Sequence, residues 1–168
     1  MTYEKTLEKV RSVVGSLERP EELDRYVDTL LSIKGEVIDE ILSRLNLPES
    51  QKVYLRDLLD NFYTSLVLDR VEKFWKERYE RSFENVKEDI SAEIYIIVAS
   101  ELASVISEKL LEILGKEESA RIIPYIVGAI IFSLAFSSSA REDMEQDFLG
   151  VSAALMERIR KFGAGKGD

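Results

Sequence analysis

Clustered carboxylates are the side chains of this chain whose type and spacing best suit metal binding or catalysis. Glu36, Asp39 and Glu40 are three and four residues apart, and Glu142 and Glu145 repeat the three-residue step. Carboxylates with this spacing share one side of a helix. Oxygen ligands on facing helices can hold Mg²⁺. These five residues are therefore candidate Mg²⁺ ligands, and they raise the hypothesis of a helical hydrolase of nucleotides or polyphosphates.

The same acids also have an interpretation without a metal. The two groups lie in opposite halves of the chain, so only the tertiary fold could bring them together. Acidic residues are common on hydrated helix faces and near helix N-termini, where they complement the helix dipole. This second interpretation is the favoured one, so no cofactor is expected, with Mg²⁺ kept for the hydrolase alternative.

A group of aromatic residues is the second feature that could carry function. Val71, Trp75, Tyr79 and Phe83 follow one another in steps of four, and Phe74 lies beside them. Each step of four overshoots a helical turn by about 40°, so the row winds around its helix. Either that helix crosses two neighbours, or part of the row is exposed. Because exposed Trp, Tyr and Phe often anchor interfaces, we assign Phe74, Trp75, Tyr79 and Phe83 as candidate partner-binding residues.

The composition excludes several kinds of chemistry. The sequence contains no His and no Cys, which removes the commonest general base, thiolate nucleophiles and the usual zinc ligands. A net charge of −9 disfavours binding to nucleic acid. The few amide side chains and many charged ones resemble the bias of heat-adapted proteins. The charged segment from Tyr3 to Lys9 does not resemble a signal peptide, so a cytoplasmic location is expected.

The element that must organise the fold is the uncharged run from Ile122 to Ala140. Its apolar side chains point in all directions around a helix, which is typical of a core helix or a membrane span. Pro124, the serines that follow Phe136 and the lack of a basic flank argue against the membrane. We therefore predict a buried central helix at about 122–136, surrounded by the other helices, with a membrane span as the less favoured reading.

Apolar periodicity predicts helices for the rest of the chain. The predicted ranges are 3–17, then 20–45 with a break near Gly35, 49–81, 85–114 ending at Gly115, the central helix from about 117, and a last helix from Ser139 to Phe162. The last helix is expected to bury Leu155, Ile159 and Phe162 in the core. A single helix over 49–114 would be about 100 Å long, which is too long for a compact domain. The break is placed at 81–85 because Asn85 can cap the next helix, with Glu88 at its third position. The fold class is all-α: a single compact bundle of six or seven helices, one domain at 1–162 and a flexible tail at 163–168.

These observations predict a non-enzymatic helical interaction or scaffold protein that forms a homo-oligomer. A second protein is the other partner considered, and nucleic acid and membrane are not expected. The alternative is the Mg²⁺-dependent hydrolase described above. The third hypothesis is a bundle that senses a small molecule in a pocket beside Tyr125 and Phe132.

Overall fold

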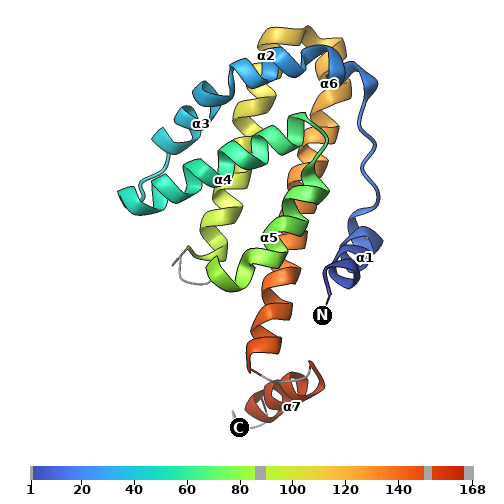
Figure 1. Ribbon diagram of the computed structural model, residues 1–168, viewed down its shortest axis with the longest axis vertical. Coiled ribbons are helices and arrows are strands. Elements are labelled where there is room, and N and C mark those ends of the chain that lie inside the picture. Colours follow the sequence, from blue (N-terminus) through green and yellow to red (C-terminus); the bar gives the residue numbers. More distant parts are fainter. Residues whose placement is uncertain (1, 86–89, 150–152, 165–168) are drawn as a thin grey trace.

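The fold is all-α, as predicted. The computed structural model describes residues 2–85, 90–149 and 153–164, without the side chains of 81–85, 144–149, 153, 154, 156 and 164. Within these ranges there is no strand. The elements, shown in Figure 1, are α1 (Tyr3–Val14), the 3₁₀ helix η1 (Glu21–Tyr26), α2 (Val27–Ser32), α3 (Lys34–Ser43), α4 (Glu49–Val67), α5 (Val71–Asn85), α6 (Ala92–Leu149) and α7 (Ala153–Ala164).

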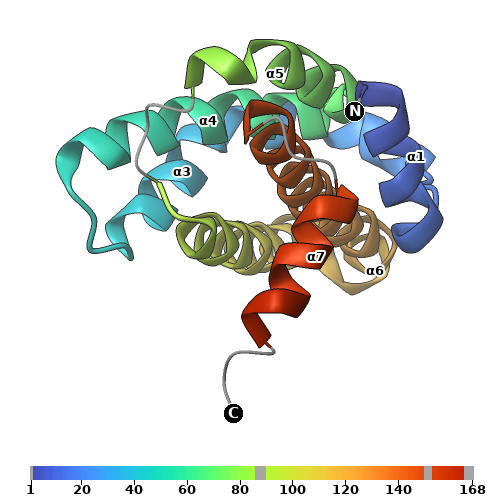
Figure 2. The same cartoon turned by 90° about the horizontal axis from the view of Figure 1, so that it is seen from below.

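Helix α6 is a helical hairpin. Gly115 interrupts it with a φ of 75° and a ψ of −179°, and the chain reverses there (Figures 1 and 2). Residues 92–114, here called the first arm, lie beside residues 116–149, the second arm. The Ser119 hydroxyl donates a buried hydrogen bond of 2.9 Å to the Leu110 carbonyl across the turn. The predicted helix end at Gly115 is confirmed, because a glycine can adopt this left-handed conformation.

The second arm contains the predicted central helix. Ile122, Ile126 and Phe136 are almost fully buried, and α6 packs against α1, η1, α3 and α5. The helix is not surrounded on every side, however. Pro124 is exposed and Ile131 is 51% exposed, so one uncharged side of the second arm faces outward.

The prediction of one continuous helix over 49–81 is wrong. The chain leaves the helix between α4 and α5, where Asp69 has a φ of 57°. The Arg70 amide donates to the Ser65 carbonyl at 2.7 Å and the Leu68 amide to the Thr64 carbonyl at 3.0 Å. The bond between Arg70 and Ser65 is the 6→1 bond of a Schellman helix end, with Asp in the left-handed position that Gly usually takes.

Two predicted helix starts are also wrong. Asn85 is the last residue of α5 rather than a cap of the next helix, which begins at Ala92. Ser139 starts no helix, because α6 runs on to Leu149. The Ser137 hydroxyl bonds back to the Leu134 carbonyl at 3.1 Å, so this serine is accommodated within a continuing helix. The break in the second predicted helix falls at Ile33, two residues before Gly35.

Candidate functional site

The aromatic residues of α5 pack within their own chain. The Trp75 indole N–H donates to the Ser133 hydroxyl of α6 at 2.9 Å, and the ring centroids of Trp75 and Phe136 are 5.7 Å apart. The Tyr79 ring lies 6.0 Å from Tyr3 of α1, and Phe74 lies 5.6 Å from Phe62 of α4. The winding row therefore crosses several neighbouring helices, which is one of the two arrangements predicted for it.

These rings are not fully enclosed, since Phe74, Trp75 and Tyr79 are all half-buried. Their outer edges remain open to contact from outside the bundle. The side chain of Phe83 lies outside the described part of the structure. The assignment of the four residues to partner binding thus remains a prediction, and the intramolecular contacts give these rings a structural role in addition.

The candidate Mg²⁺ ligands of α3 each face a cation. Glu36 accepts from Lys109 at 2.8 Å, Asp39 from Arg56 at 2.5 Å, and Glu40 from Arg44 at 2.7 Å. The hydrogen bond with Glu36 raises the pKa of Lys109, as expected for a cation that is stabilised by a carboxylate.

The structure does not bring the acids of α3 close to those of the second arm. The α3 acids contact the first arm near the Gly115 turn through Lys109, whereas Glu142 is exposed near the other end of the second arm. At 1.5 Å per residue the two groups are about 30 Å apart along α6. The side chain of Glu145 is not among the described ones. No group of three or more acids close enough to hold a metal ion occurs in the described residues.

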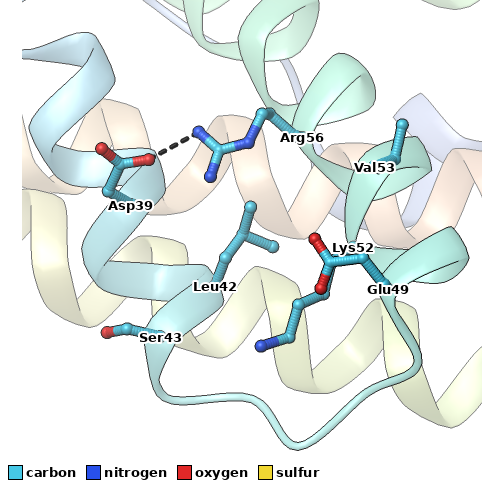
Figure 3. A pocket seen from close by; sticks show the side chains of 7 residues that line it. All are labelled: Asp39, Leu42, Ser43, Glu49, Lys52, Val53 and Arg56. Atoms are coloured by element: carbon cyan, nitrogen blue, oxygen red, sulfur yellow. Dashed lines mark hydrogen bonds and ion pairs between the residues drawn. The ribbon is translucent and has the colours of Figure 1, made fainter.

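A surface pocket of about 270 Å³ lies between α3 and the start of α4. Figure 3 shows the Asp39–Arg56 ion pair across its rim and Leu42 between the two helices. The Ser43 hydroxyl donates to the Glu40 carbonyl at 2.7 Å, so it is directed toward its own helix. The residues that line the pocket are Asp39, Leu42, Ser43, Glu49, Lys52, Val53 and Arg56.

This pocket lacks the features of a reaction centre. Its two carboxylates and two cations balance in charge, and its volume lies below the roughly 300 to 1,000 Å³ of typical ligand sites. A hydroxyl nucleophile would need a neighbouring base to activate it, and Ser43 bonds to a backbone carbonyl instead. Of these lining residues, only Asp39 was a candidate from the sequence. The Pro48 turn, which folds the start of α4 against the end of α3, was the available signal.

The residues of the hypothetical small-molecule pocket belong to the core. Tyr125 and Phe132 are both buried, and the Phe132 ring stacks on Phe136 with centroids 6.1 Å apart. Burial raises the pKa of Tyr125, while a hydrogen bond with Arg19 acts in the opposite direction. Arg19 also donates to the Val67 carbonyl at the end of α4, at 2.7 Å. These contacts join the α1–η1 segment, α4 and α6.

Large apolar side chains that were expected in the core are exposed on α7. Leu155, Ile159 and Phe162 form a row at i, i+4 and i+7, and all three are exposed, Phe162 by 77%. The prediction that this helix buries the row is wrong, because α7 is a separate helix beyond the end of α6 rather than part of one helix that starts at Ser139. In Figure 1, α7 lies beyond one end of the bundle.

The first arm of α6 carries a second exposed row, made of three large apolar residues with two serines between them. Ile96, Ile97, Ser100, Ser104 and Leu111 are all exposed and lie within a sector about 100° wide on one side of the helix. We call these five residues the outer stripe. The Ser100 hydroxyl donates to the Ile96 carbonyl at 2.9 Å, so this serine meets part of its hydrogen-bonding need without water. Periodicity predicted this helix, whereas the exposure of this side depends on which helices pack against it.

By length and apolar composition, one described helix, Ala92–Asp143, could cross a membrane, and half of its most apolar window is buried in the bundle. Length and composition alone are weak support for a span, because a core helix passes the same test. No protein-family model, curated protein or solved structure matches this chain.

Proposed function

We propose that this protein is a non-enzymatic helical interaction module that works as a homo-oligomer. The observation that carries the proposal is the exposure of large apolar side chains in rows, on the outer stripe and on α7. Single exposed apolar residues are ordinary on protein surfaces, whereas contiguous rows usually mark interfaces. Association with further copies would remove these rows from water.

The chemistry of the described surface supports a binding role over a catalytic one. The pocket between α3 and α4 is balanced in charge, and its ion pair occupies Asp39 and Arg56. The tyrosines with raised pKa values owe the shift first to burial in the bundle. A general acid or base instead needs a pKa near the working pH, at a place that substrate can reach.

Sedimentation velocity and light scattering on the full chain test this proposal. We expect a mass that is a multiple of 19.2 kDa. Because association follows mass action, the oligomer should dissociate on dilution over roughly 100 to 1 µM if the affinity lies in that range. A mass of one chain at the highest concentration would contradict the proposal.

A further inference from the structure

Helix α7 has the form of a docking element. Its apolar row runs along one side, with Ile159 56% and Phe162 77% exposed. Three of its four charged residues are positive, namely Arg158, Arg160 and Lys161. Amphipathic helices with this pattern bind through the apolar side, and the cations flank the contact. A partner surface that matches this row would therefore be apolar and flanked by acidic residues.

The position of α7 directs this row away from the core of its own chain. The second arm has 34 residues from 116 to 149 and the first arm 23 from 92 to 114. At 1.5 Å per residue, the second arm extends about 16 Å past the start of the first. Helix α7 begins beyond that overhang (Figure 1). A second copy of the chain can therefore reach it.

The outer stripe fits this row in length and polarity. Helix α7 is about 18 Å long, and the stripe spans about 21 Å from Ile97 to Leu111. Both of these stripe residues are about half exposed. Small side chains at Ser100 and Ser104 allow another helix to approach closely between the two large ones.

The charges beside the two surfaces are complementary. Glu93, Glu108 and Glu112 are exposed on or beside the outer stripe. The ion pairs of Glu108 with Arg44 and of Glu112 with Lys109 are long, at 3.9 Å each. Such pairs leave room for a further cation. Opposite potentials on two surfaces favour their association and fix its orientation.

We infer that α7 of one copy docks on the outer stripe of a second copy. This inference rests on the proposed function, to which it adds the two contact surfaces. If the arrangement is a two-fold symmetric dimer, each copy supplies one α7 and one stripe, so the contact forms twice. An anionic membrane is the other surface that a basic amphipathic helix can bind. The net charge of −9 on the chain opposes that alternative.

Two double variants and one single control variant of the full chain test the inference by sedimentation velocity. The α7 variant is Ile159→Glu with Phe162→Glu, and the stripe variant is Ile97→Glu with Leu111→Glu. The control is Val13→Glu, which changes an 82% exposed residue of α1. We expect each double variant to raise the dissociation constant at least tenfold with an unchanged far-ultraviolet circular dichroism spectrum. The control should leave the dissociation constant within twofold of the original.

A mixture of the two double variants separates this contact from a general loss of solubility. The α7 variant retains a stripe and the stripe variant retains an α7, so one of the two contacts can form. We expect differently tagged chains to associate more tightly in the mixture than either variant does alone. Higher salt should weaken the association of the original chain, because the flanking charges are exposed.

Several outcomes would overturn the inference. An oligomer that both double variants leave unchanged uses other surfaces, so the proposed function would stand without this contact. A monomeric original chain would remove both proposals. A monomer whose double variants lose thermal stability would indicate that α7 docks on its own chain. A monomer that binds phosphatidylserine vesicles through the α7 row would assign that row to a membrane.

Discussion

At the scale of single residues, buried polar groups determine which helices adjoin. The Tyr63 side chain is fully buried in α4, and its hydroxyl donates to the Leu30 carbonyl of α2 at 2.6 Å. Burial raises the pKa of Tyr63 above its ordinary value. The phenol therefore stays neutral. Its hydroxyl oxygen is the only heavy atom that a phenylalanine at this position would lack.

Replacing Tyr63 with Phe should lower the free energy of unfolding by about 1 to 2 kcal/mol, because the Leu30 carbonyl would lose a buried donor. Urea denaturation followed by circular dichroism measures this change. The control is Tyr26→Phe, which removes the same atom from a side chain that is only half-buried. If the two variants lose equal stability, the bond between Tyr63 and Leu30 does not carry the effect.

Trp75 shows how a residue can be recognised from the sequence while its partner is not. Its place in a row of aromatic residues could be predicted from the sequence. Its bond to Ser133 was not, because that serine lies 58 residues away in the apolar helix. The same bond explains why a hydroxyl is tolerated within that run: Ser133 also donates to the Ala129 carbonyl at 2.7 Å. Both of its hydrogen-bonding roles are therefore satisfied.

At the scale of elements, backbone conformation at a few positions determines where helices end. Gly115 was predictable as a helix end because its residue type is the usual one there. Asp69 was not, since Asp adopts the left-handed conformation far less often than Gly and no sequence signal marked it. The consequence is a break that divides the predicted long helix into α4 and α5.

Two glycine substitutions separate backbone conformation from packing. An added Cβ would meet no atom within 4 Å at either Gly115 or Gly35. Gly115 has a φ of 75°, so Gly115→Ala should destabilise the protein by about 1 to 3 kcal/mol. Gly35 lies within α3, so Gly35→Ala should stabilise the protein by about 0.5 to 1 kcal/mol.

Urea denaturation of both variants measures these opposite signs. The two changes in free energy can be compared only if both variants expose a similar surface area on unfolding. The slope of the unfolding free energy against urea concentration reports that area. A Gly115→Ala protein as stable as the original would mean that the turn between the arms can be built with an ordinary helical residue.

At the scale of the whole molecule, buried phenols make stability depend on alkaline pH. Burial is the largest cause of the raised pKa values of Tyr3, Tyr63, Tyr95 and Tyr125. An unfolded tyrosine releases its proton near pH 10, whereas the folded chain holds these protons to higher pH. The stabilisation is therefore complete below about pH 10 and is lost as the pH rises through the folded pKa values.

We expect the free energy of unfolding to fall between about pH 9.5 and pH 11.5, measured by urea denaturation at several pH values. In the Tyr63→Phe variant the fall should be shallower by up to about 1.4 kcal/mol per pH unit, since one such proton is removed. An unchanged slope would show that Tyr63 ionises in the folded chain as readily as in the unfolded chain.

The sequence alone determined the helical class, the central place of the 122–136 segment and the helix end at Gly115. These follow from local periodicity and residue type, which act over one or two turns of helix. It also located the aromatic and acidic candidates along the chain.

Only the tertiary structure decided how these elements meet. It separated the acids of α3 from Glu142, paired Trp75 with Ser133, broke the chain at Asp69 and left α7 outside the bundle. Each of these outcomes depends on which apolar sides cover one another. That choice is made by contacts between residues far apart in the chain, and periodicity within a single helix does not encode them.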